Sequence, residues 1–230
     1  MSHRSLSLFH IIREPKVKSD GKPPALILLH GVGSNEEDLF GLAGELDDRF
    51  SIVSVRAPIV IGPGAFGWFA IGVDNGRLIH NEEEALEGIE AVNKFVDEAI
   101  AEYEWDSGRV YLMGFSQGAI MSAGMVLFHP DKVAGAVIMS GCLLPRMMER
   151  IPMNRSETGR IPVFISHGKW DDLLPVELAR SLRDTLSTLA IDIEYHEYPM
   201  GHQVSYETVE DIAAWLTKQI DIHDRFKSTQ

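Results

Sequence analysis

Leu-Met-Gly-Phe-Ser-Gln-Gly, residues 112–118, is the most informative stretch of this 230-residue chain. It carries the pattern Gly-x-Ser-x-Gly with Ser116 at its centre, after an apolar run (109–113) and before a run rich in small residues (117–128). A serine on a strained strand-to-helix turn needs glycine neighbours, because the chain reverses there and must leave Oγ exposed. The stretch therefore predicts a nucleophile elbow, with an ordinary glycine-rich turn as the alternative.

Two downstream loops supply candidate partners for this serine, in the order acid and then histidine that the elbow fold requires. The apolar run 161–167 leads into Asp171 and Asp172, and the run 191–198 leads into His202. Strands of an α/β sheet place their sites beyond their carboxyl ends, so both loops are expected to meet Ser116 there. The sequence thus predicts a triad of Ser116, His202 and one of the two aspartates.

A third loop offers hydrogen-bond donors for the charge that attack on an ester creates. The apolar run 26–29 leads into His30-Gly-Val-Gly, a turn expected to face the serine. One fixed N–H donor at the developing oxyanion is typically worth ~3–4 kcal/mol. The candidate donors are the backbone N–H groups of Val32 and of Gln117, the residue after the serine. For His30 and His167, hydrogen bonding within the loops is favoured over a catalytic role.

Taken together, these motifs resemble the small α/β-hydrolase family of carboxylesterases and phospholipases that includes acyl-protein thioesterases. The resemblance extends from about residue 26 to 216 and rests on the following motifs: Leu29-His-Gly-Val-Gly33, Trp68-Phe69, Gly114-Phe-Ser-Gln-Gly118, His167-Gly-Lys-Trp-Asp171 with Pro175, and Gly201-His202. It implies Ser116 as nucleophile, Asp171 rather than Asp172 as acid, and His202 as base. It also implies Val32 and Gln117 as the oxyanion hole. Leu173-Leu174 stands where the family often has two valines.

Strand-like and helix-like patterns alternate along the chain. The expected strands are 5–13, 25–30, 51–56, 109–113, 133–139, 162–167 and 191–197, and the expected helices are 36–46, 82–104, 117–128, 176–190 and 206–220. Asn35 and Asn81 are the expected caps of the first two helices. This order predicts an α/β-hydrolase fold in one domain over residues 1–230. Its central sheet should be mostly parallel with helices on both faces, and no separate lid domain fits the length.

Two segments break the alternation and are expected to form the substrate side, 59–80 and 141–160. Their candidate substrate contacts are Trp68, Phe69 and Leu143, with burial in the core or a dimer contact as the alternative for each. Without a lid, the acyl site should be open and shallow, which suits short or medium acyl chains.

Composition excludes several other classes of protein. A net charge of −13 argues against nucleic acid or an anionic membrane as partner. The single cysteine, Cys142, permits no intrachain disulfide and is expected to be a packed thiol. Neither a secretory signal nor an apolar run of about 20 residues is visible, so a cytoplasmic protein is expected. No metal or cofactor is expected, since an acidic helix start explains the carboxylates beside His80.

The function implied by the resemblance is that of a serine carboxylesterase acting on short- to medium-chain esters through an acyl-enzyme intermediate. Acyl-protein thioesterase or lysophospholipase activity on the same triad is the alternative. A peptidase or a lactonase is less favoured, and lactonases of this scaffold normally carry a cysteine at the position of Ser116. A non-catalytic binding protein is less favoured because Ser116, Asp171 and His202 are all present. The expected partner is a small-molecule ester, and a homodimer is possible. The natural acyl group, and the choice between oxygen ester and thioester, stay open.

Overall fold

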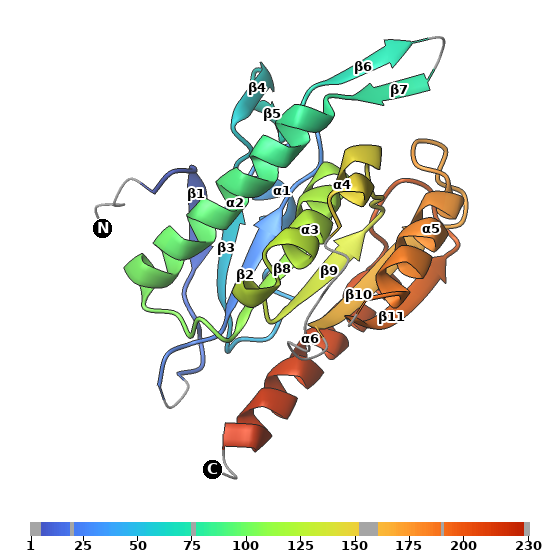
Figure 1. Ribbon diagram of the computed structural model, residues 1–230. Coiled ribbons are helices and arrows are strands. Elements are labelled where there is room, and N and C mark those ends of the chain that lie inside the picture. The colour runs from blue at the N-terminus through green and yellow to red at the C-terminus, as the bar shows by residue number, and fades with distance from the viewer. Residues whose placement is uncertain (1–5, 19–20, 75–76, 152–160, 190, 228–230) are drawn as a thin grey trace.

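The computed structural model describes residues 6–18, 21–74, 77–151, 161–189 and 191–227, and a seven-stranded sheet forms its centre (Figure 1). In spatial order the strands are β1 (His10–Arg13), β3 (Ser51–Val55), β2 (Ala25–Leu29), β8 (Val110–Phe115), β9 (Gly135–Met139), β10 (Ile161–Gly168) and β11 (Ile191–Tyr198). Only β1 runs antiparallel to its neighbour in this sheet. The predicted α/β-hydrolase fold class is confirmed.

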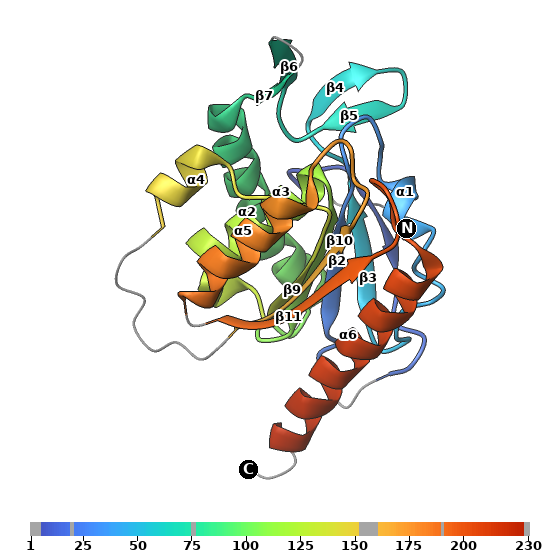
Figure 2. The ribbon, with the colours of Figure 1, turned by 90° about the vertical axis from the view of Figure 1, so that its right-hand side faces the viewer.

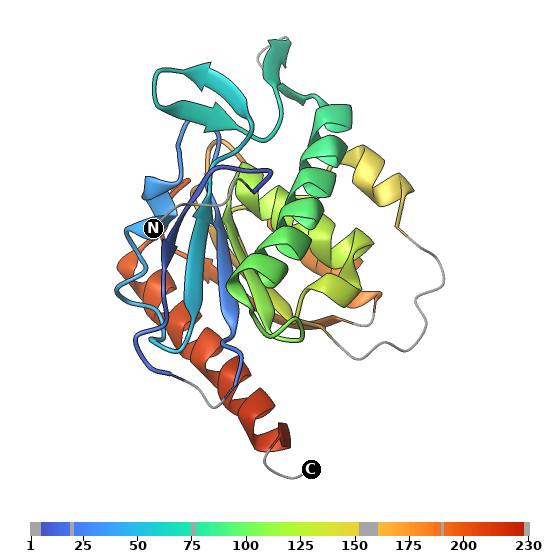
Figure 3. The same ribbon diagram turned by 90° about the vertical axis from the view of Figure 1, so that its left-hand side faces the viewer.

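Helices cover both faces of the sheet, as Figure 2 and Figure 3 show from opposite sides. On one face lie α2 (Glu82–Tyr103), α3 (Gln117–Phe128), α4 (Pro145–Glu149) and α5 (Val176–Ser187), and on the other α1 (Glu37–Phe40) and α6 (Tyr206–Lys227). A 3-10 turn, Pro130–Lys132, follows α3. No helix in the described part of the chain is long and apolar enough to cross a membrane.

The sheet separates two hydrophobic clusters, and this explains the unbroken apolar runs of its strands. The larger cluster lies under α2, α3 and α5, and the smaller one under α1 and α6. Strands β2, β3 and β9 are buried along their whole length, as expected for parallel strands covered on both faces. Cys142 belongs to the larger cluster, where burial raises the pKa of its thiol to about 12.

Helix α2 begins where the sequence predicts. The side chain of Asn81 accepts a hydrogen bond from the backbone N–H of Glu84 at 3.3 Å, and three glutamates fill the first turn. The acidic side chains suit the positive end of the helix dipole. The helix ends before Glu104, which has a left-handed φ of 53°.

The largest differences between the other predicted elements and the structure are four. Helix α1 has only four residues, because the chain passes into turns at Gly41, and Asn35 lies before its cap, Glu36. Segment 59–80 forms two hairpins that the sequence did not predict: β4 (Ile59–Gly62) with β5 (Ala65–Gly67), and β6 (Ile71–Asp74) with β7 (Arg77–His80). Helix α6 extends beyond residue 220, and the first strand begins only at His10. Residues 5 and 190, at the ends of two predicted elements, and residues 152–160 lie outside the described chain.

Figure 1 shows both hairpins above the carboxyl ends of the parallel strands. The loops that follow β2, β8, β10 and β11 begin at these carboxyl ends, because the four strands are parallel. The fold therefore brings the residues singled out in the sequence to one edge of the sheet.

Candidate active site

Ser116 lies on a sharp turn between β8 and α3 whose backbone only the local glycines permit. Its φ of 54° and ψ of −114° are strained for a residue with a side chain. A Cβ at Gly114 would collide with the carbonyl oxygen of Gly118, and a Cβ at Gly118 would collide with that of Leu29. The turn is held by the N–H of Ser116, which donates to Met139 at 3.0 Å. Residues 112–118 thus have the geometry of the predicted elbow.

Two hydrogen bonds connect Ser116, His202 and Asp171. Nε2 of His202 lies 2.9 Å from Oγ of Ser116, and Nδ1 lies 2.7 Å from Oδ2 of Asp171. Because Nδ1 faces a carboxylate, Nδ1 carries the proton, and the lone pair of Nε2 can accept the proton of the serine hydroxyl. The Asp171 side chain is fully buried, whereas Asp172 is exposed. The structure therefore brings together the three residues that the sequence predicted, with Asp171 as the acid that contacts the histidine.

The loop of Asp171 is fixed by its own backbone and by the histidine loop. Oδ1 of Asp171 accepts the N–H groups of Leu173 at 3.0 Å and of Leu174 at 2.8 Å. The N–H of Trp170 donates to the carbonyl of Met200 at 3.0 Å. A Cβ at Gly168 would collide with the carbonyl of Met200, so β10 must end in glycine for the two loops to pack this closely.

The turn after β2 is braced by His30. Its Nδ1 donates to the carbonyl of Gly31 at 2.7 Å, and its Nε2 accepts the N–H of Ala57 at 3.0 Å. The indole N–H of Trp68 donates to the carbonyl of His30 at 3.0 Å. Both ring nitrogens of a neutral imidazole are thereby satisfied, and burial lowers the pKa of His30. His30 has the hydrogen-bonding role predicted for it.

Acidification is expected to destabilise the folded protein from about pH 6.5 downward, because burial lowers the pKa of both His30 and His167. Above that pH both rings are neutral in the folded and in the unfolded chain. As the pH falls, the unfolded chain binds protons first, so the free energy of unfolding decreases until the folded rings are protonated as well. Urea unfolding at about pH 7.5 and 5.5 measures this decrease. His167→Gln should reduce it, and an unchanged urea midpoint in the wild type would contradict the expectation.

The backbone amides of Val32 and Gln117 are available on the wall of the serine pocket. Both residues line the pocket, and within the described chain no hydrogen bond occupies either N–H. The side chain of Gln117 is bound elsewhere: Oε1 accepts the N–H of Trp68 at 2.9 Å and Nε2 donates to the carbonyl of Phe69 at 2.8 Å. These two side-chain hydrogen bonds fix the start of α3 and leave the backbone N–H of Gln117 for a ligand.

The pocket above Ser116 has a volume of about 350 Å³ and a largely apolar wall. Besides Ser116, His202, Val32 and Gln117, its lining consists of Gly31, Ile71, His80, Phe115, Ile120, Leu173 and Leu174. Within the described part of the chain, no group of three His, Cys, Asp or Glu side chains is placed to hold a metal ion. The pocket therefore offers apolar contact beside a hydroxyl–imidazole pair.

The expected substrate contacts of Trp68, Phe69 and Leu143 are corrected by the structure. Trp68 and Phe69 are 1% and 0% exposed, and Leu143 packs against the larger core cluster; none of them lines the pocket. The bonds from Gln117 hold the backbone of the two aromatic residues so that their side chains enter the core. The core alternative is the one that the structure supports.

Sequence reasoning missed most of the apolar lining. Leu173, Leu174, Phe115 and Ile120 are all within four residues of Asp171 or Ser116, and this proximity was an available signal. Ile71 and His80 belong to segment 59–80, which the sequence placed on the substrate side, but neither was singled out, because the two meet only through the register of β6 with β7.

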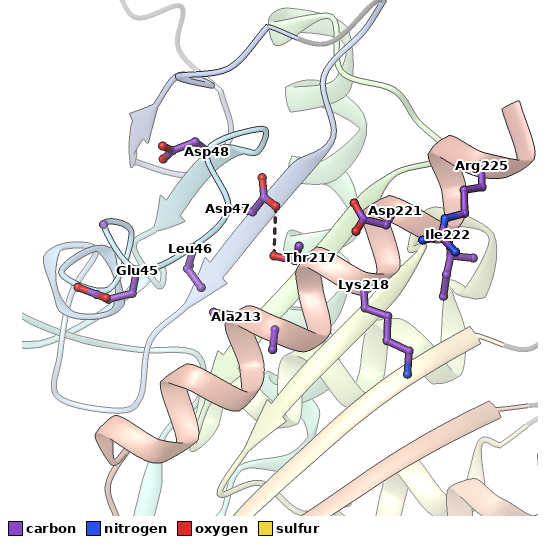
Figure 4. Close-up of a pocket in the computed structure, with 12 residues that line it drawn as sticks. Glu45, Leu46, Asp47, Asp48, Ala213, Thr217, Lys218, Asp221, Ile222 and Arg225 are labelled. Atoms are coloured by element: carbon purple, nitrogen blue, oxygen red, sulfur yellow. Dashed lines mark hydrogen bonds between the residues drawn. The ribbon is translucent and has the colours of Figure 1, made fainter. Parts of the chain in front are cut away.

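A larger and more open depression of about 850 Å³ shares no lining residue with the serine pocket (Figure 4). It lies between residues 44–48 and α6, where Oδ2 of Asp47 accepts the hydroxyl proton of Thr217 at 3.1 Å. Its lining contains acidic and basic side chains but no serine, cysteine or histidine. The smaller pocket at Ser116 is therefore the one with a nucleophile and a base.

Comparisons with known proteins show which proteins this chain resembles. The chain is 34% identical over 217 residues to acyl-protein thioesterase 1 of Gibberella zeae, which covers 85% of this chain and 90% of that protein. It is 27% identical over 197 residues to the putative hydrolase MhqD of Bacillus subtilis, covering 85% and 93%. The crystal structure of a Bacillus cereus carboxylesterase aligns with a TM-score of 0.78 at 28% identity, covering 92% and 94% of the two chains. The model of the phospholipase/carboxylesterase family matches residues 12–220, and the chain belongs to this family of α/β-hydrolases.

Proposed function

We propose that this protein is a serine carboxylesterase in which Ser116, His202 and Asp171 act as a triad. The observation that carries the proposal is the pair of hydrogen bonds on His202, 2.9 Å to Ser116 and 2.7 Å to Asp171. This arrangement suits a histidine that removes the proton of a serine hydroxyl while a buried carboxylate holds the ring.

The reaction proceeds in two steps through an acyl-enzyme. Oγ of Ser116 attacks the ester carbonyl, Nε2 of His202 takes its proton, and the N–H groups of Val32 and Gln117 stabilise the oxyanion. His202 then gives the proton to the leaving oxygen, and the C–O bond to the alcohol breaks. A water molecule, deprotonated by His202, hydrolyses the acyl-enzyme and restores Ser116. Asp171 stays ionised throughout and stabilises the imidazolium.

The apolar lining supports a short or medium acyl chain as the substrate group. Each buried methylene contributes about 0.8 kcal/mol until the pocket is full, and further carbons gain nothing. The pocket's volume of about 350 Å³ accommodates only part of a long fatty chain. A thioester is the second candidate, because one relative at 34% identity is named an acyl-protein thioesterase.

A substrate panel tests the proposal. It comprises p-nitrophenyl esters from acetate to palmitate, an acyl-thioester and a lysophospholipid, each assayed with the wild type and with Ser116→Ala. Hydrolysis by the wild type alone supports the proposed function. Equal rates for the two proteins would refute it, and the ratio of ester to thioester rates decides between the two leaving groups.

Acyl-chain specificity is expected to peak at short or medium length. The value of kcat/KM should rise from acetate, reach a maximum and decline toward palmitate, since the apolar wall is limited in extent. Leu173→Ala should reduce kcat/KM for the preferred chain by about threefold or more while leaving acetate nearly unchanged, since it removes methylene contacts.

The matched control for this prediction is Leu178→Ala. Leu178 is another exposed leucine, but it lies on α5 and is absent from the pocket lining. It should leave the whole chain-length profile unchanged. A wild-type profile that keeps rising to palmitate would contradict a pocket of this size.

A further inference from the structure

A second histidine lies against Asp171, and the mechanism above does not use it. His167, near the end of β10, has a fully buried side chain whose Nε2 is 2.7 Å from the carbonyl oxygen of Leu174. The same Nε2 lies 3.3 Å from Oδ2 of Asp171, the oxygen that accepts the hydrogen bond from His202. The ring of His167 therefore lies beside the carboxylate, while its N–H donates to Leu174.

The surroundings of His167 define its tautomer. Both neighbours of Nε2 are oxygen acceptors, so Nε2 carries the hydrogen. Nδ1 is buried and has no hydrogen-bond partner among the described residues, so no acceptor stabilises a second proton there. Burial lowers the pKa of His167 against the opposing effects of Asp171 and of Glu197 on β11, and His202 lowers it further. The ring is a neutral donor.

Leu174 connects His167 to Oδ1 of the Asp171 carboxylate. Its carbonyl accepts the hydrogen of Nε2, and its N–H donates to Oδ1 of Asp171 at 2.8 Å. The turn 171–174 is thereby held between the ring and the carboxylate. Loss of the ring donor would release the carbonyl of Leu174 and thereby loosen the residue whose N–H is one of the two groups that orient Oδ1.

We propose that His167 is a positioning residue, whose neutral Nε2–H holds the turn 171–174 and orients Asp171 toward His202. This inference rests on the proposed function, because it requires Asp171 to serve as the acid. A neutral donor can orient the carboxylate without cancelling the negative charge that stabilises a protonated His202. A cationic side chain in this position would compete with His202 for that charge.

Packing alone does not account for an imidazole in this place. An apolar side chain would fill the same space without leaving Nδ1 buried and unpaired, which is a costly arrangement. His10 offers a contrast: it is also buried, but its two ring nitrogens contact Leu8 at 2.9 Å and Tyr103 at 2.6 Å. It lies on β1, the strand at the other end of the strand order from β10 and β11 (Figure 1).

Kinetics of three variants test the proposal: His167→Met, His167→Gln and the control His10→Met. His167→Met keeps an unbranched side chain but has no donor, so kcat should fall about tenfold while KM stays nearly constant, because the ring does not touch substrate. His167→Gln carries an amide N–H near the position of Nε2 and should recover most of the lost kcat. His10→Met should lower thermal stability without changing kcat.

The pH profile separates positioning from a loss of stability. In His167→Met the carboxylate of Asp171 is held less firmly against His202, so the acid-side midpoint of kcat/KM should move downward by about half a pH unit. His10→Met should leave the midpoint in place. Wild-type kcat together with an unmoved midpoint in His167→Met would overturn the proposal, although the wild type would remain an active esterase.

A measurement on the wild type does not depend on any variant or on activity. Two-dimensional 1H–15N NMR of the histidine side chains should show His167 as the neutral Nε2–H tautomer from about pH 7.5 to 5.5. A proton on Nδ1, or protonation of this ring at the pH of a free histidine, would contradict the proposal. If instead no ester or thioester is hydrolysed by the wild type, the proposed function itself has failed.

Discussion

Ser116→Ala is expected to abolish ester hydrolysis and to leave the fold intact. Without Oγ, His202 has no hydroxyl to deprotonate, and removal of a triad serine typically lowers kcat by about 10⁶. Alanine retains the Cβ, so the strained φ of 54° at the elbow is the same in the variant as in the wild type. Initial rates on the preferred p-nitrophenyl ester measure the loss, and circular dichroism with thermal unfolding monitors the fold.

Ser140→Ala is a closely matched control for this substitution. Ser140 is also buried, follows the neighbouring strand β9 and has a φ of 49°, but its Oγ has no hydrogen-bond partner among the described residues. The variant should hydrolyse esters at the wild-type rate. His202→Ala should be about as inactive as Ser116→Ala, and the double variant little worse, because the triad acts as a unit. More than a few per cent of wild-type kcat in Ser116→Ala would contradict the assignment.

The elbow was predictable because its constraints are local. At residues 114 and 118 a side chain would collide with backbone, so the sequence must show glycine wherever this turn is built. Helix α2 was predictable for the same reason, since Asn81 and the acidic first turn lie within a few residues of its start. Such signals require no knowledge of the tertiary structure.

The pocket wall depends on contacts between distant residues and was not predictable in the same way. The side chain of Gln117 holds the backbone of Trp68 and Phe69, about 48 residues earlier, and thereby places both rings in the core. Aromatic character alone could not distinguish core burial from substrate contact. The hairpins of residues 59–80 consist of strands of only three or four residues. Such strands are too short for an alternation of apolar and polar residues to be recognised in the sequence.

The order of residues alone does not decide between Asp171 and Asp172; the family spacing favours Asp171, and the structure gives the physical reason. The two carboxylates are adjacent in the chain, so both lie in the loop after β10. The structure separates them by burial: Asp171 faces His202 with no exposed side-chain surface, and Asp172 faces solvent. A buried carboxylate interacts with an imidazolium more strongly than an exposed one, because water screens it less.

Asp171→Asn is therefore expected to reduce kcat by about 10⁴, the effect of the same change in a serine-protease triad. The amide oxygen can still accept the N–H groups of Leu173 and Leu174, so the turn should keep its shape. The amide nitrogen would face Nδ1 of His202 as a donor, which favours the tautomer with the hydrogen on Nε2. That tautomer cannot accept the proton of the serine hydroxyl, so the chemical step fails while substrate binding persists.

The matched control for this prediction is the neighbouring substitution, Asp172→Asn. It removes the same charge from the same loop, and its exposed side chain makes the effect on kcat small, within about twofold, since solvent screens the charge. Steady-state kinetics on one p-nitrophenyl ester should show a fall in kcat at nearly constant KM for Asp171→Asn alone. If Asp172→Asn is the inactive variant instead, the hydrogen bond between Asp171 and His202 is not the one that orients the base.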